Sequence, residues 1–226
     1  MSTYQCNKER GIETISKLGE EAHFVQADVS KPTERTRLFK EARAHLGTIS
    51  MLVTNFDGPK NGTFMSKANE DWQAAFELIM LSALDLIQHC LPEMIEQGFG
   101  RIVNISSTSA KEITTGTPLL NGIKPGLLGA LGTLTREVGA TGVTVNSILP
   151  GPIDMDLLRQ FAPHAVGRED LSPEKAVQLY AERGPMKRVG TIEEFGALCA
   201  FLCSRQAGYI TGQSIVIDGG IVPVLL

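Results

Sequence analysis

The sequence predicts one α/β domain built on a doubly wound, mostly parallel sheet. Short apolar runs typical of strands alternate along the chain with longer amphipathic runs typical of helices. Such alternation favours a parallel sheet that is covered by helices on both faces. The 226 residues contain no long linker, repeat or low-complexity tract, so residues 1–226 are expected to form a single domain.

The composition is that of an ordinary globular protein, with 42% hydrophobic and 20% charged residues. A net charge of −4 provides no basic field for nucleic acid. No apolar run approaches the roughly 20 residues that span a bilayer, and the first residues lack the apolar core of a signal peptide. We therefore expect a cytoplasmic protein with neither nucleic-acid nor membrane partners.

The cysteines and histidines predict no metal site and no redox pair. The histidines are scattered, and the cysteines form no Cys-x-x-Cys motif. We expect the thiols to be small buried hydrophobic side chains in a reducing compartment. They are Cys6, Cys90, Cys199 and Cys203.

In the first half of the chain, strands are expected over 23–29 and 50–56. A helix is expected over 31–47, with a proline near its start and a glycine at its end, as suits helix termini. The long apolar run over 69–98 predicts a second helix, kinked or broken near Pro92.

In the second half, strands are expected over 101–107, 144–151 and 214–220, and helices over 126–139 and 191–204. Ligands of such sheets bind beyond the carboxyl ends of the strands. Functional residues are therefore expected directly after strands, where the chain has Asp28, Asn55, Ser107 and the turn Pro150–Gly151.

The same positions carry a family likeness. Six pieces occur in a specific order and spacing: ADV (27–29), LVTN (52–55), GRIVNISS (100–107), Lys124, TVNSILPGPI (144–153) and YITGQSIVIDGG (209–220). With them the chain resembles the short-chain dehydrogenase/reductase family over residues 5–220, and within it the 3-oxoacyl-carrier-protein reductases. The resemblance implies a Rossmann-like sheet and an oxidoreductase that interconverts carbonyl and hydroxyl groups with NADP or NAD.

The resemblance also implies site residues. Ser107 would orient the substrate oxygen, and Lys124 would lower the pKa of a catalytic Tyr and grip the ribose. The cofactor would contact a set of residues that follow the strands: Asp28, Val29, Asn55, Lys124, Pro150, Gly151 and Ile153. Residues 154–183 would form a lid over a carbonyl or acyl substrate, and no metal is implied. Three alternatives remain: Ser107 caps the strand exit, Lys124 is a solvated lysine, and Asp28 caps a helix.

The chain departs from the family at its phosphate loop. The family's Thr-Gly-x-x-x-Gly-x-Gly turn, which lets the backbone approach a pyrophosphate, does not occur here. The one Gly-x-Gly, at Gly98 and Gly100, has Val103 where a third glycine would fall. The likeness begins within the family's second strand, near residues 2–7, so the usual first strand and helix are absent. A shortened gene product, with Met1 an internal methionine, and a protein that evolved without this unit are both open.

A second departure concerns the proton donor. The family's Tyr lies 13 residues after the Ser, which places it at Leu120, while Lys124 follows in register four residues later. Ile79 stands where an assisting Asn often lies. This pattern resembles an atypical branch that lacks the Tyr. Lys111 and Glu112 could supply acid–base chemistry instead, or form an exposed ion pair.

Three functions follow from these features. The first is a reductase that uses NAD(P)H on a carbonyl or acyl substrate. The second is an isomerase, lyase or cyclase that needs no cofactor and reuses Ser107 and Lys124. The third is a non-catalytic partner subunit of an intact relative. In each case we expect a homo-oligomer, dimer or tetramer, formed through the helices over 69–98 and 126–139, or else these helices pack only within the monomer.

Overall fold

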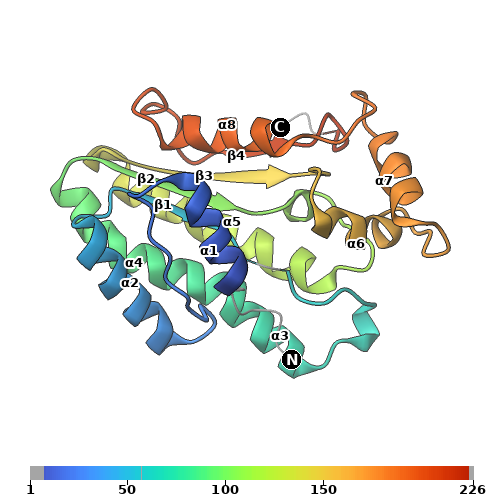
Figure 1. The fold of residues 1–226 in the computed structure, drawn as a ribbon, viewed down its shortest axis with the longest axis horizontal. Coiled ribbons are helices and arrows are strands. Elements are labelled where there is room, and N and C mark those ends of the chain that lie inside the picture. Colours follow the sequence, from blue (N-terminus) through green and yellow to red (C-terminus); the bar gives the residue numbers. More distant parts are fainter. Residues whose placement is uncertain (1–7, 57, 224–226) are drawn as a thin grey trace.

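The computed structural model describes residues 8–56 and 58–223. Its four strands form one parallel sheet in the order β1-β2-β3-β4 (Figure 1). They are β1 (Met51–Thr54), β2 (Gly100–Ile105), β3 (Val143–Pro150) and β4 (Ser214–Ile217). The predicted α/β fold with a parallel sheet is confirmed, and the predicted strand remnant over 2–7 lies outside the described residues.

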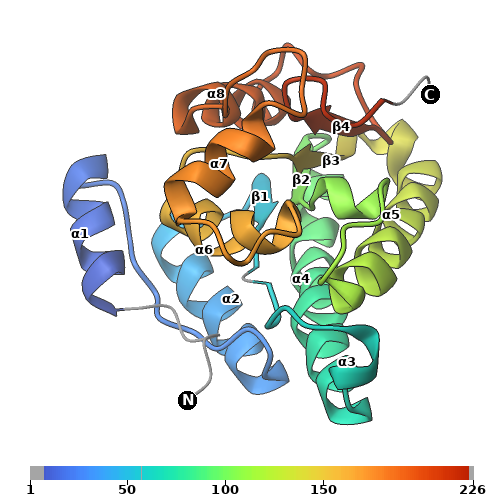
Figure 2. The same ribbon diagram turned by 90° about the vertical axis from the view of Figure 1, so that its right-hand side faces the viewer.

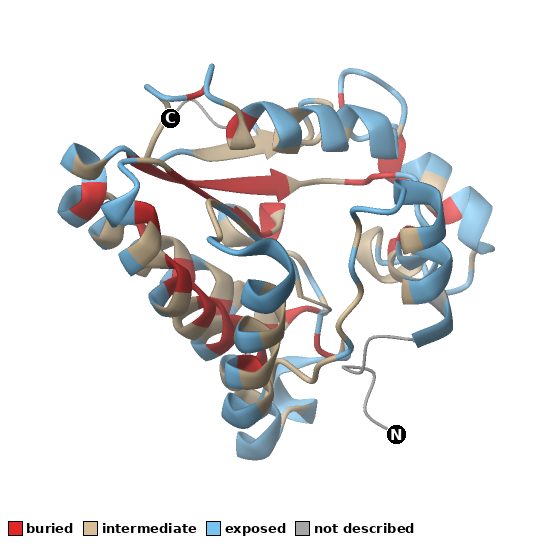
Figure 3. Ribbon diagram, turned by 60° about the vertical axis from the view of Figure 1, so that its left-hand side comes forward, coloured by how far each residue is buried: buried red, intermediate tan, exposed pale blue. Residues whose placement is uncertain are grey.

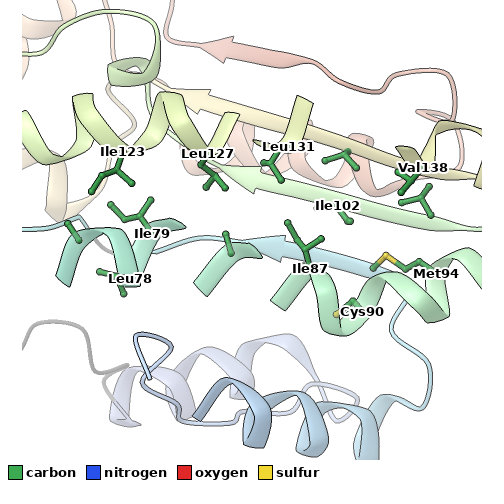
Figure 4. Close-up of a cluster of buried hydrophobic side chains, with 14 of the residues drawn as sticks. Leu78, Ile79, Ile87, Cys90, Met94, Ile102, Ile123, Leu127, Leu131 and Val138 are labelled. Atoms are coloured by element: carbon green, nitrogen blue, oxygen red, sulfur yellow. The ribbon is translucent and has the colours of Figure 1, made fainter. Parts of the chain in front are cut away.

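One face of the sheet is covered by a long helical run and by α5. The run consists of α3 (Asn69–Phe76), a π-helical turn (Glu77–Leu81) and α4 (Ser82–Glu96), and α5 spans Pro118–Val138. Side chains such as Ile87 and Leu127 lie with Ile102 of β2 in the main core (Figure 4). Burying each such side chain contributes roughly 1.5–3 kcal/mol, so this core fixes β2 beneath both helices.

The opposite face is covered by α8 (Ile192–Cys203). Its fully buried Leu202 packs with Val103 of β2 and Ile148 of β3. Ile102 and Val103 thus enter different cores, because successive side chains of a strand point to opposite faces. Helices cover both faces of the central strands, as the near-continuous burial of β2 and β3 requires (Figure 3).

The remaining helices surround this sandwich. They are α1 (Lys8–Leu18), α2 (Pro32–Leu46), α6 (Asp156–Ala165) and α7 (Pro173–Ala181), with 3-10 turns at Phe64–Ser66, Thr108–Ala110 and Gly139–Thr141. α6 and α7 share a small core of their own, which includes Leu158 and Tyr180. They fall within the predicted lid and stand in front of the carboxyl end of the sheet (Figure 2).

Three predicted elements are corrected. No strand forms over 23–29, because no described strand lies in the ladder beside it and a strand is defined by its pairing. The helix expected over 126–139 already begins at Pro118, a residue suited to a first helical turn. The run over 69–98 is not broken at Pro92, since α4 continues to Glu96, and its irregular turn is the π-helical one.

The run Asn69–Glu96 passes a length and composition test for a membrane span, with a mean hydropathy of 1.4 in its most apolar window. Core helices pass the same test, and one side of this run packs against the sheet (Figure 4).

Strand β1 lies at one edge of the sheet and pairs with β2 alone among the described strands. Its side chains Met51 and Val53 are 50% and 45% exposed, so β1 forms a free edge in the described part of the chain.

Candidate active site

A small pocket opens where β2 ends and α5 begins. Seven side chains from β1, β2, the π-helical turn and α5 line it: Phe56, Ile79, Asn104, Ile105, Ser106, Lys124 and Leu127. The pocket therefore lies at the carboxyl end of the sheet, where ligands of parallel α/β sheets bind.

The amine of Lys124 is the charged group of this pocket. Lys124 lies in the second turn of α5, and its Nζ donates a hydrogen bond of 2.7 Å to the carbonyl of Ser106. Burial lowers the pKa of Lys124 to about 8, because an apolar environment disfavours the ammonium form. A lysine with this pKa can both hold and release a proton near neutral pH.

Two serines follow β2 and differ in their bonding. Ser106 is 6% exposed, and its Oγ has no hydrogen-bond partner in the described chain. Ser107 begins the 3-10 turn Thr108–Ala110, and its Oγ accepts a bond of 3.2 Å from the amide of Ser109. Buried hydroxyl groups almost always have a partner, so the Ser106 hydroxyl is free to bond a water molecule or a ligand atom.

A ladder of polar side chains crosses the three strands beneath the pocket. Thr54 donates to Asn104 at 3.0 Å, and Asn104 donates to Ser147 at 3.3 Å. The strand register places these three residues side by side. The ladder fixes Asn104 at the floor of the pocket.

Leu120 and Ile79 stand at the two positions where the resemblance implies a Tyr and an Asn. Leu120 packs at the margin of the main core, beside Gly58, and Ile79 is buried and lines the pocket. The neighbouring Asn121 is occupied elsewhere, because its amide donates to the Thr114 carbonyl at 2.9 Å. Of the side chains that line the pocket, only Lys124 can exchange a proton near neutral pH.

The first two implied cofactor residues lie at the start of α2. Asp28 accepts bonds from the amide and hydroxyl of Ser30 and pairs with Lys31 at 3.3 Å. Burial raises the pKa of Asp28, but the bonds from Ser30 and Lys31 outweigh it and lower the pKa overall. Val29 packs against the main core, and its carbonyl accepts from Arg35. Asp28 thus orders the turn that precedes α2, whose N-cap residue is Lys31.

The other implied cofactor residues follow β1 and β3. Asn55 is exposed directly after β1. Pro150 ends β3, and Gly151 donates its amide to the Ile217 carbonyl at 3.0 Å. A Cβ on Gly151 would lie 2.5 Å from Asp218 Cβ, so only glycine allows this approach. Ile153 is buried and bridges to Gly190, which places it behind the pocket rather than in its lining.

Lys111 and Glu112 do not form a pair in this site. Lys111 is exposed, and Glu112 lies 3.7 Å from Arg183. Among the described cysteines the thiols are free, and burial raises the pKa of Cys90 and of Cys199 to about 11. The described residues bring no three potential metal ligands together.

The pocket residues fit the ribose and nicotinamide end of a dinucleotide. The Lys124 amine can donate to ribose hydroxyl groups, and the unpartnered Ser106 hydroxyl supplies a further polar contact. Asn55 and the Pro150–Gly151 turn stand at the neighbouring strand ends and can flank the same group.

The fold and the site define a Rossmann-like α/β protein with a buried lysine at the carboxyl end of its sheet. A family model described as enoyl-(acyl carrier protein) reductase matches residues 1–222. The NADPH-dependent reductase BacG of Bacillus subtilis is 33% identical over 91% of this chain and 80% of its own length. The 3-oxoacyl-[acyl-carrier-protein] reductase FabG of Staphylococcus epidermidis is 30% identical over 92% of this chain and 81% of its own.

A solved structure of YwfH, an NADPH-dependent reductase involved in bacilysin biosynthesis, matches with a TM-score of 0.88. It is 29% identical and covers 97% of this chain and 87% of that one. The chain belongs to the short-chain dehydrogenase/reductase family.

Sequence reasoning missed five of the seven residues that line the pocket: Phe56, Asn104, Ile105, Ser106 and Leu127. Ser106 was passed over for the adjacent Ser107, because the family register points to the second serine. Asn104 was missed because it lies inside a strand that was expected to be buried. For Ser106 and Asn104 the available signal was a polar residue within or directly after a buried central strand.

Proposed function

We propose that the protein is an NADPH-dependent reductase of a carbonyl substrate in which Lys124 is the proton donor. The supporting observation is the Lys124 amine, which lies in the pocket beside the Ser106 hydroxyl with a pKa of about 8. The proposal makes this chain an atypical family member that lacks the Tyr. We further propose a cytoplasmic location.

Each pocket residue has a task in this reaction. The Ser106 hydroxyl, or that of Ser107, donates a hydrogen bond to the substrate oxygen and orients it. Lys124 gives its Nζ proton to that oxygen as the carbonyl becomes an alcohol, and it regains a proton from water. The reduced nicotinamide, when bound, supplies the hydride. Phe56, Ile79 and Leu127 are the apolar side chains that exclude water from the reacting carbon.

The proposed substrate is a 3-oxoacyl thioester or a similar small ketone. BacG is an NADPH-dependent reductase, and FabG is a 3-oxoacyl-[acyl-carrier-protein] reductase. Within residues 154–183, Met155 and Leu157 are 40% and 57% exposed. As part of a lid, these side chains would cover an apolar chain.

The test measures NADPH binding by fluorescence and NADPH oxidation with a short 3-oxoacyl thioester. We expect saturable binding and turnover that Lys124→Met removes while binding weakens only modestly. Lys111→Met, the change of an exposed lysine nearby, is the matched control and keeps the activity. Absence of NADPH binding, or equal turnover in both variants, contradicts the proposal.

A second candidate is the non-catalytic partner subunit, which the free edge of β1 favours. Met51 and Val53 are exposed there, and unpaired edge groups are a template for a further strand. We propose that the occupant of this edge would be a strand of an intact relative. Binding of NADPH without turnover, together with copurification of that relative, would support this candidate over the first.

Self-association is proposed separately, through α4 and α5. Gly126, Gly129 and Gly132 line one side of α5 with open space above each. Leu81 and Ile95, on the π-helical turn and α4, are 37% and 40% exposed. Two copies could bring these helices close together, and sedimentation of Gly129→Leu against wild type tests whether a dimer or tetramer depends on them.

A further inference from the structure

At the amino end of β2, opposite the pocket, Arg101 is buried with a charge that no carboxylate balances. Its residue is 4% exposed. Its Nε donates to the Ser204 carbonyl at 2.9 Å, and its Nη1 donates to the carbonyls of Gly100 and Gly142 at 2.8 and 3.2 Å. All three acceptors are neutral. Within the described residues, no ion pair joins Arg101 to an Asp or Glu.

A second guanidinium lies beside it. The Cζ atoms of Arg101 and Arg205 lie 4.3 and 4.7 Å from the centroid of the same Phe99 ring. The two charges are therefore at most about 9 Å apart. Burial, followed by the charge of Arg205, lowers the pKa of Arg101. Arg205 is exposed and likewise forms no ion pair in the described part of the chain.

Arg35 shows how the same fold treats another buried guanidinium. It too is 4% exposed, but its Nε lies 2.6 Å from Asp85 and its Nη1 lies 2.9 Å from Glu77. An uncompensated buried charge is costly, and buried charges are normally paired. The Arg101 region has the opposite arrangement, with two cations and no Asp or Glu paired to either among the described residues.

We propose that Arg101 and Arg205 form a binding site for a phosphate monoester. A dianion matches the two positive charges, and guanidinium groups suit the geometry of phosphate oxygens. The hydrogen bonds of Arg101 to the three carbonyls use Nε and Nη1, which leaves Nη2 for such a ligand. A Cβ on Gly208 would lie 3.5 Å from that nitrogen, so the glycine keeps a side chain away from it.

The site is separate from the reductase pocket. Arg101 and Ser106 lie at the two ends of β2, about 17 Å apart at the usual rise of a strand, and the amino ends of β2 and β3 point away from α6 and α7 (Figure 1). The proposal does not rest on the proposed function. Its ligand would act away from the catalytic end, as an effector or as a stabilising ion.

The test titrates the whole protein with inorganic phosphate and with phenyl phosphate at constant ionic strength. Calorimetry should show one saturable site, with a dissociation constant on the order of 1 mM or lower, and thermal stability should rise with phosphate. Arg205→Gln should weaken binding at least tenfold. Arg205→Glu should abolish binding and raise the stability measured without phosphate, because its carboxylate takes the place of the ligand. These variants leave the buried Arg101 in place, so the fold is kept.

Two control variants locate the effect. Arg168→Gln, which removes a paired surface guanidinium, and Lys124→Met, in the other pocket, should both bind phosphate as wild type does. Loss of binding in Lys124→Met would assign the phosphate to the reductase pocket and overturn the proposal. Absence of a saturable signal, or unchanged binding in both Arg205 variants, would also overturn it. If the Arg205 variants change only self-association, an acidic side chain of a second copy would be the anion. That result would overturn the proposal as well.

Discussion

Lys124 and Arg101 are two buried cations at opposite ends of β2. Both donate hydrogen bonds only to backbone carbonyls in the described chain, Lys124 to Ser106 and Arg101 to Ser204, Gly100 and Gly142. Burial lowers the pKa of each side chain. They differ in what burial can achieve, because a lysine gives up its proton near pH 8 while a guanidinium stays charged at any ordinary pH.

This difference assigns different chemistry to the two ends of the sheet. The Lys124 amine can lose its charge by releasing a proton, and the proposed reductase needs a proton at the substrate oxygen. The charge of Arg101 is permanent, so only an anion from outside can balance it. The same physical cost, a buried charge without a carboxylate, therefore predicts catalysis at one end and binding at the other.

The largest expected effect is on catalysis and follows from Lys124→Met. General acid catalysis by a positioned side chain contributes about 10²- to 10⁴-fold, so we expect NADPH oxidation to fall about a thousandfold. The unfolding free energy should stay the same or rise, because a buried amine is replaced by an apolar chain of similar length. Steady-state rates and urea unfolding measure the two effects. A variant that loses activity only in proportion to its loss of stability would show a structural role.

Gly142→Ala should have the next largest effect, a loss of stability. The change should disturb the structure around Arg101 and not the pocket around Lys124. Gly142 has a φ of +80°, and a Cβ there would lie 2.1 Å from the Gly98 carbonyl oxygen. Strain and the clash together should lower the unfolding free energy by about 3 kcal/mol. Gly126→Ala, on an exposed helix with open space, should instead raise it by roughly 0.5–1 kcal/mol. Equal effects of the two changes in urea unfolding would contradict this reading.

Much of the fold could be predicted from the sequence. The apolar runs that became β2 and β3 are buried on both faces, so their composition alone separates them from the helices. The strand expected over 23–29 failed because strand character needs a neighbour, and no local pattern reveals whether one is present. The start of α5 was also misplaced: the helix was expected from residue 126, directly after Pro125, yet the structure places this proline inside the helix.

The site was predictable in position but not in detail. The resemblance pointed to Lys124, which lines the pocket, and the rule that ligands bind after parallel strands pointed to Asn55 and Ser107 at the same end of the sheet. It could not tell that Ser106, not Ser107, has the unpartnered hydroxyl, because bonding to Ser109 depends on the turn after β2. The Arg101–Arg205 pair was invisible to it, because 104 positions separate the two residues and only the fold brings them to one ring.

Asp85→Asn tests the carboxylate-paired arrangement that the arginine end lacks. Asp85 lies 2.6 Å from the buried Arg35. In the variant, Glu77 would be the carboxylate partner that Arg35 retains. Because both carboxylates are partly exposed, we expect a loss of about 2 kcal/mol in urea unfolding. Asp170→Asn removes an exposed partner of Arg168 and should leave the unfolding free energy nearly unchanged. Similar costs for the two changes would mean that burial of Arg35 does not require its carboxylates.

A final comparison tests by pH whether the Lys124 amine releases its proton. The pKa of Lys124 falls from its ordinary value of 10.5 to about 8 on folding. Between these values the unfolded chain binds more protons than the folded chain, so folding stability gained from this group rises with pH. The difference in unfolding free energy between wild type and Lys124→Met should therefore increase from pH 8 to pH 10, by at most about 1.4 kcal/mol per pH unit. Parallel curves for wild type and Lys124→Met would show that the amine stays charged when buried, and Lys124 would then be no freer to release its proton than Arg101.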